Sequence, residues 1–209
     1  MNIDWGWVRK QLLKKEKVPA SAIDCLRECL EEAGSSASPA VASVRKKIGD
    51  IGLTGSIVSS YMKAATDAHI FLATLGGRIE EAASRRMAEG EHLRGYLLDR
   101  IGSFAVESLA ESVEAKLRRD YAAKGLSVSM RFSPGYCDWP IEEQAKLSSL
   151  LDFQKAGVRL TESFMMVPRK SISAIVGIGP EGAFSKTKSP CGACKKRDCD
   201  HRRTVITPR

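Results

Sequence analysis

Ten residues of the 209-residue chain, the segment Arg131–Pro140 (RFSPGYCDWP), combine several groups that bind small molecules. Arg131 carries a guanidinium group, which can hold a carboxylate through two parallel hydrogen bonds. Tyr136 adds an aromatic ring and a hydroxyl group. Pro134 and Gly135 favour a tight turn, which exposes backbone N–H and C=O groups. The segment therefore predicts a turn that binds a ligand, although a strand end closed by a Pro-Gly turn fits the same residue types.

A second group of chemically active residues lies near the C-terminus, in the pattern C-x2-C-x4-C-x-H. Its members are Cys191, Cys194, Cys199 and His201. Four such ligands suit one tetrahedral Zn²⁺, and the three cysteines alone could anchor an iron–sulfur cluster. A redox-active thiol pair and a basic tail with incidental cysteines are the alternatives. The basic residues around the pattern favour an acidic partner such as a flavodoxin- or ferredoxin-type reductant.

The elements next to the turn are a short strand and a helix. Residues 126–132 form a β-prone run that leads into the turn, and Pro140 fits the first turn of a helix that continues to about residue 151. We expect the buried positions of this helix to be Ile141, Ala145, Leu147 or Ser148, and Leu151.

Two further strands are expected after this helix, at residues 161–167 and 171–178. They are predicted to form a hairpin beside the turn. Glu162 and Ser163 would then point to opposite faces of the sheet, so that only one of them faces a ligand.

The clearest helical pattern begins at Arg78, pauses near Gly90 and continues to Arg118. Its apolar stripe consists of Leu93, Leu97, Ile101, Phe104, Leu109, Val113 and Leu117. This spacing predicts a long helix that forms the back wall of the domain. The run 69–75 before it is strand-like, and His69 is interpreted as a sheet-edge residue, since the sequence shows no partner that would make it a ligand.

The N-terminal region is expected to be helical, over residues 3–17 with Asp4 as N-cap and again over residues 21–33. Cys25 and Cys29 stand four residues apart on the second helix. They could share a metal, but without further ligands nearby ordinary packing is the preferred interpretation.

Residues 40–60, which contain three glycines, predict short strands and turns rather than a helix. The fold class is α+β: a twisted, mostly antiparallel sheet packed against long helices, with a helical N-terminal region and a Cys-rich C-terminal tail. The expected domains are 1–60, 61–182 and 183–209.

Two ordered signatures resemble the activation domain of vitamin B12-dependent methionine synthase. Arg131, Pro134, Gly135 and Tyr136 match that family's Arg-x-x-Pro-Gly-Tyr segment, in which S-adenosylmethionine (AdoMet) binds. Residues 160–168 (LTESFMMVP), with Ser171-Ile172-Ser173, resemble the second signature. The resemblance runs from about Phe71 to Gly179.

The resemblance implies an AdoMet site and a contact with a corrinoid protein. The residues implied at the AdoMet site are Arg131, Ser133, Pro134, Gly135, Tyr136, Glu162 and Ser163. Asp99, on the long helix, corresponds to an acidic residue that faces the corrinoid-binding module, although a solvated surface charge explains it equally well.

The function that the resemblance implies is reductive reactivation of cobalamin. In that family an electron donor reduces inert cob(II)alamin while AdoMet donates the methyl group that traps the reduced form. We expect no catalytic acid or base. The 209 residues show no corrinoid-binding motif, so the expected role is that of an accessory subunit acting on a separate corrinoid protein, such as a methionine synthase lacking its own activation domain.

Composition leaves two alternative functions open. The net charge of +8 would suit nucleic acid binding through the basic tail, but the aromatic content of 6% is low for that function. An AdoMet-dependent methyltransferase with another acceptor is the second alternative, although no Gly-rich loop follows a first strand. The sequence lacks an apolar run of membrane-spanning length and a signal-peptide core, so a cytoplasmic protein is expected.

Overall fold

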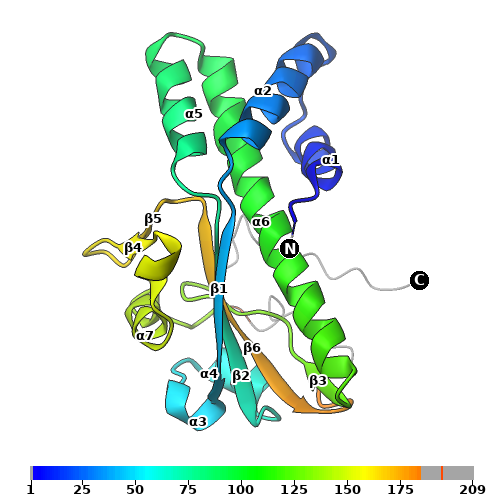
Figure 1. Ribbon diagram of the computed structural model, residues 1–209, viewed down its shortest axis with the longest axis vertical. Coiled ribbons are helices and arrows are strands. Elements are labelled where there is room, and N and C mark those ends of the chain that lie inside the picture. Colours follow the sequence, from blue (N-terminus) through cyan, green and yellow to red (C-terminus); the bar gives the residue numbers. More distant parts are fainter. Residues whose placement is uncertain (1, 185–193, 195–209) are drawn as a thin grey trace. The chain divides into compact units, whose positions relative to one another are not determined.

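The computed structural model describes residues 2–184 and residue 194, and these residues form an α+β fold, as predicted (Figure 1). In chain order its helices are α1 (Trp5–Lys15), α2 (Ile23–Ser36), α3 (Ile48–Ile51), α4 (Ser56–Met62), α5 (Arg78–Ala88), α6 (His92–Ala122) and α7 (Glu143–Leu150). Its strands are β1 (Ala40–Lys47), β2 (Asp67–Thr74), β3 (Leu126–Val128), β4 (Arg159–Leu160), β5 (Met166–Val167) and β6 (Ser171–Pro180). Short 3-10 helices occupy Ala20–Ala22 and Phe153–Ala156.

The strands form two sheets. The larger has the order β1-β2-β6-β3, and β3 pairs antiparallel with β6 so that Val128 lies opposite Ile178. The smaller sheet pairs β4 with β5. The predicted hairpin of residues 161–167 with 171–178 is therefore wrong. β6 is buried along almost its whole length, which suits an inner strand of the larger sheet rather than one arm of an isolated hairpin.

The described residues divide into two compact units, each drawn from three stretches of the chain. The first unit comprises the residues up to 42, then 72–116 and 152–172, whereas the second comprises 43–71, 117–151 and the residues from 173 onward. The expected division at residues 60 and 182 stays a prediction.

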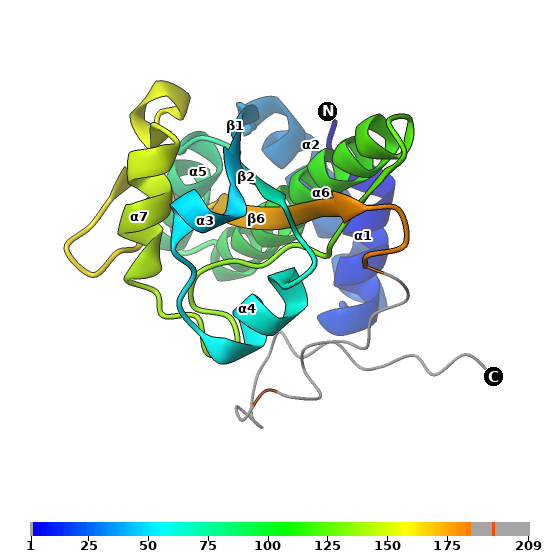
Figure 2. The ribbon, with the colours of Figure 1, turned by 90° about the horizontal axis from the view of Figure 1, so that it is seen from below.

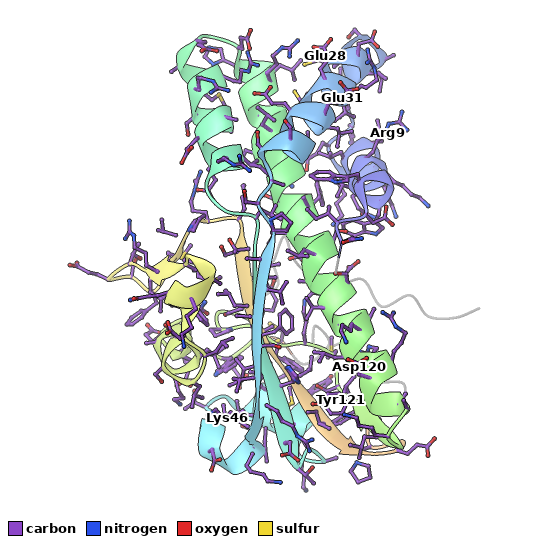
Figure 3. All side chains as sticks on the ribbon, in the orientation of Figure 1. Arg9, Glu28, Glu31, Lys46, Asp120 and Tyr121 are labelled. Atoms are coloured by element: carbon purple, nitrogen blue, oxygen red, sulfur yellow. The ribbon has the colours of Figure 1, made fainter. Side chains whose placement is uncertain are left out.

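The core of the first unit is built by α1, α2, α5 and the first part of α6. Asp4 caps α1 as expected, because its carboxylate accepts a hydrogen bond from the Trp7 N–H at 2.8 Å. Ion pairs join α2 to its neighbours. Glu32 pairs with Arg86 of α5 at 3.1 Å, and Glu28, which is labelled in Figure 3, pairs with Arg94 of α6.

Helical periodicity predicted the buried face of α6 well, with one exception. Six residues of the predicted stripe on α6 are buried, but Leu93 is 48% exposed because it lies in the first turn of α6, just after the Gly90 break. Cys29 is fully buried in the core and Cys25 packs against it, so the packing interpretation is confirmed.

The second unit contains α3, α4, α7 and β3. The expected strands and turns of residues 40–60 are only partly correct, because β1 is followed by the short helices α3 and α4. Gly52 and Gly55 have positive φ and separate these helices, and their presence in the sequence favoured turns over helices in the prediction.

On α7 the inward residues are Gln144 and Leu147, whereas Ala145, predicted to be inward, is exposed.

His69 is not a sheet-edge residue, because β2 lies between β1 and β6. Its Nδ1 atom lies 3.1 Å from the hydroxyl of Tyr121, near the C-terminal end of α6 (Figure 3). The partner that the sequence did not reveal is thus 52 residues away.

None of the described helices is both long enough and apolar enough to span a membrane.

Candidate functional site

The predicted turn at residues 133–139 is present in the second unit and is closed by its own backbone. Phe132 forms two backbone hydrogen bonds with Ile175 of β6, at 2.8 and 2.9 Å, which fixes the start of the turn. The Tyr136 N–H then donates to the Ser133 carbonyl at 3.1 Å, and the Gly135 N–H donates to the Trp139 carbonyl at 2.8 Å. Gly135 has φ +87°, a conformation that glycine adopts without strain.

Burial divides the turn into a covered entrance and an exposed tip. Arg131, Ser133 and Pro134 are buried, whereas Gly135 and Tyr136 are exposed, Tyr136 by 36%. The ring of Phe132 packs against Tyr61 of α4, with 5.5 Å between ring centroids. The turn therefore combines a buried guanidinium group with backbone and an aromatic ring that remain open to solvent.

Asp138 anchors the turn to the start of α4. Its carboxylate accepts hydrogen bonds from the Ser56 hydroxyl at 2.9 Å and from the Ile57 N–H at 3.0 Å. Burial raises the pKa of Asp138, but these hydrogen bonds outweigh burial and leave the pKa below its usual value. In Figure 2 the yellow-green chain that leads to α7 passes beside α4.

The position of Gly55 shows how close this contact is. A Cβ atom at Gly55 would lie 2.9 Å from the Asp138 carbonyl oxygen, and Gly55 has φ +91°. Both observations make glycine the residue that lets the turn approach α4.

Trp139 and Gln144 belong to the same region and were not predicted as site residues. Gln144 is buried, and its Oε1 atom accepts a hydrogen bond from the Ser173 hydroxyl of β6 at 2.9 Å. Trp139 is fully buried. Because large apolar or amide side chains usually serve packing, their types gave no functional signal in the sequence.

Glu162 and Ser163 lie in the first unit, in the loop between β4 and β5, and both are exposed. The expected alternation across a strand is wrong, because the Thr161 N–H donates to the Met165 carbonyl at 2.9 Å and closes a tight loop. The hydroxyls of Thr161 and Ser163 lie 3.0 Å apart. The ligand contacts of Glu162 and Ser163 stay a prediction.

Asp99 also lies in the first unit, on α6, where it has a partner that the sequence did not indicate. The Nζ atom of Lys170 lies 2.7 Å from Oδ1 of Asp99 and 3.0 Å from the Ser103 hydroxyl. A Cβ atom at Gly102 would lie 3.1 Å from Cε of Lys170, so this glycine leaves room for the lysine stem. The corrinoid contact expected of Asp99 stays a prediction.

The predicted metal ligands fall almost wholly outside the part of the chain that the structure describes. Cys191, Cys199 and His201 lie outside the described residues, and Cys194 alone lies within them. Residues 2–184 and 194 contain no group of three or more His, Cys, Asp or Glu side chains placed to hold a metal ion. The metal site at the tail stays a prediction.

No curated protein matches the chain. A solved structure, the crystal structure of the MetH reactivation domain bound to AdoHcy, matches with a TM-score of 0.61 at 18% identity, over 90% of this chain and 76% of that chain. At this identity the match shows the shared fold.

A family model gives the stronger result. The model of the vitamin B12 dependent methionine synthase activation domain matches residues 57–189, a stretch that includes the Arg131 turn, α7 and β6. Because this match covers more than half of the chain, the protein belongs to the family of vitamin B12 dependent methionine synthase activation domains.

Proposed function

We propose that the chain binds AdoMet at the Arg131 turn and supports the reductive methylation of cobalamin carried by a separate corrinoid protein. The observation that carries the proposal is the buried guanidinium of Arg131 at the entrance of an exposed turn, within the stretch that the family model matches. The solved relative with the same fold holds AdoHcy, which is AdoMet without the transferred methyl group.

Each part of the turn has a group suited to one part of AdoMet. The guanidinium of Arg131 would bind the carboxylate of the methionine half through two charge-assisted hydrogen bonds. Gly135, exposed and without a side chain, would let the ligand approach the backbone. The exposed ring of Tyr136 would face the adenine ring or the sulfonium cation.

The protein's role in this proposal is to bind and orient the methyl donor. The corrinoid supplies the reduced cobalt centre that accepts the methyl group, and a separate electron donor, proposed to be a flavodoxin- or ferredoxin-type protein, supplies the electron. The chain holds AdoMet with its methyl group directed toward that acceptor, and no protein acid or base is needed for the transfer.

Titration calorimetry with AdoMet tests the binding step. The wild-type protein should bind AdoMet, and Arg131→Ala should weaken binding by about 2 to 5 kcal/mol, the cost of leaving a buried charge contact unmade. Arg159→Ala, at an exposed position of β4, is the matched control and should leave the affinity unchanged. No binding by the wild-type protein, or equal binding by Arg131→Ala, contradicts the proposed site.

The reactivation step requires a second assay. The protein, AdoMet, a one-electron reductant and a cob(II)alamin-loaded corrinoid protein from the same cell are mixed, and methylcobalamin is followed by its visible spectrum. We expect its formation to be faster with this chain than without it. If the rates are equal for every corrinoid protein of that cell, the chain does not act on a separate corrinoid protein.

A further inference from the structure

At the start of α6, in the first unit, two large apolar side chains are open to solvent. Leu93 is 48% exposed and Tyr96 is 43% exposed. They stand three residues apart on the helix, so they lie on the same side of it. The Tyr96 hydroxyl donates a hydrogen bond to Glu16, the residue that ends α1, and this contact restricts the ring. A restricted aromatic ring loses little conformational entropy when a partner covers it.

The end of α1 beside this ring is positively charged. Lys14 and Lys17 flank Glu16 in the chain, and both are exposed. Glu16 does not neutralise them, because Arg100 holds its carboxylate at 2.6 Å. Among residues 2–184 neither lysine forms an ion pair with an acidic side chain. The helix dipole favours a base in the last turn of α1, but it does not account for Lys17, which lies beyond the helix.

These four exposed residues form a surface that we call the α1–α6 face: Leu93, Tyr96, Lys14 and Lys17. An apolar centre with an aromatic residue and a polar rim is typical of protein–protein interfaces. The basic edge fits an acidic partner and disfavours a second copy of the chain, since a symmetric dimer would place like charges opposite each other. A lipid surface is disfavoured as well, because Val8 and Leu12, on the apolar side of α1, are buried in the core.

We infer that the α1–α6 face docks an acidic surface of the corrinoid protein, an inference that rests on the proposed function. Asp99 follows Tyr96 by three residues on α6, so the face continues to the residue expected to meet the corrinoid-binding module. Lys170 pairs with Asp99 at 2.7 Å, so this carboxylate repels an acidic partner little. The continuity with Asp99 favours the corrinoid protein over the electron donor as the occupant.

Reversing the charge of the face tests the inference. Lys14→Glu/Lys17→Glu should raise the Kd for a cob(II)alamin-loaded corrinoid protein of the same cell about tenfold at low salt, measured by titration calorimetry with the full chain. The effect should shrink as the salt concentration rises, because exposed charges are screened. The matched control Arg119→Glu/Lys124→Glu makes the same change of charge at exposed positions of the second unit and should leave the Kd unchanged.

Leu93→Ala tests the apolar centre separately. It should raise the same Kd about fivefold at low and at high salt, since this contact is uncharged. In the methylcobalamin assay both variants should raise the KM for the corrinoid protein and leave kcat unchanged, because docking precedes methyl transfer. The Kd for AdoMet should stay the same in both variants, which separates the α1–α6 face from the AdoMet site.

The outcomes distinguish the docking face from the proposed function. If the wild-type chain speeds methylcobalamin formation, but both variants keep the wild-type Kd and KM for the corrinoid protein, the face is overturned and the proposed function stands. A loss of affinity for a flavodoxin- or ferredoxin-type reductant alone also overturns the inference and assigns the face to the electron donor. If the wild-type chain speeds the reaction of no corrinoid protein of that cell, the proposed function fails and the inference fails with it.

Discussion

The Nη2 atom of Arg45 lies 3.1 Å from Oδ2 of Asp67, and this ion pair joins β1 to β2 within the second unit. The Asp67 side chain is buried, and Lys47 lies 3.2 Å from its other oxygen. The hydrogen bond from Arg45 lowers the pKa of Asp67 most, hydrogen bonds from Thr66 and Lys47 lower it further, and burial opposes them, which leaves a pKa of about 2. A carboxylate with a lowered pKa stabilises the folded state only while it is ionised.

Asp67→Asn should therefore lower the free energy of unfolding at neutral pH and lose this effect in acid. The folded-state pKa of about 2 lies below the ordinary value of 3.8, so the contribution is complete above pH 3.8 and disappears as the pH falls through about 2. Denaturant unfolding of both proteins at several pH values measures it. Asp152→Asn, at an exposed position, is the control. A difference that stays constant down to pH 2 contradicts the prediction.

Asp99→Asn should destabilise the first unit by about 1 to 3 kcal/mol, because it leaves the buried ammonium of Lys170 without its carboxylate. Adding Lys170→Met should restore most of the stability. The double variant also tests the expected corrinoid contact: if it folds normally and still slows methylcobalamin formation, Asp99 acts on the partner. A normal rate assigns Asp99 to the ion pair alone.

Glu162→Ala and Ser163→Ala should change the free energy of unfolding by less than about 0.5 kcal/mol, since both side chains are exposed in the β4–β5 loop. A loss of AdoMet affinity in either variant then reports a ligand contact directly. Calorimetry on both variants makes the measurement. Unchanged affinity in both removes this loop from the AdoMet site.

Protein purified without oxygen should contain about one zinc ion or an iron–sulfur chromophore if Cys191, Cys194, Cys199 and His201 bind metal. Elemental analysis and the visible spectrum decide between these two metals. Replacing Cys191 and Cys194 by serine should remove the metal. Metal-free protein with three freely titratable thiols in the tail would favour a basic tail with incidental cysteines.

The sequence predicted the parts of the fold that local patterns determine. The Asp4 cap of α1 follows from the residue type at the helix start, the apolar stripe of α6 follows from helical periodicity, and the Pro134-Gly135 turn follows from backbone preferences. Strand pairing did not follow, because the partners of β6 are set by burial across the whole sheet and not by neighbouring residues. The hairpin expected for residues 161–178 failed for this reason.

The AdoMet contacts of Arg131 and Tyr136 stay a prediction, which rests on their residue types and on the family pattern. The contacts of Gln144 and Lys170 were not predicted, because they depend on distant partners. Ser173 lies 29 residues from Gln144, and Asp99 lies 71 residues from Lys170. Contacts over such distances in the chain leave no trace in one sequence.

The hydrogen bond from Ile57 to Asp138 also has a consequence for folding kinetics. It joins residues 81 apart in the chain, so the entropy of closing a long loop must be overcome before it forms. We therefore expect the turn to reach its final form late in folding, after α4 and the strands of the second unit have come together. In the folded protein, hydrogen exchange at the Ile57 amide would report how often this late step is reversed.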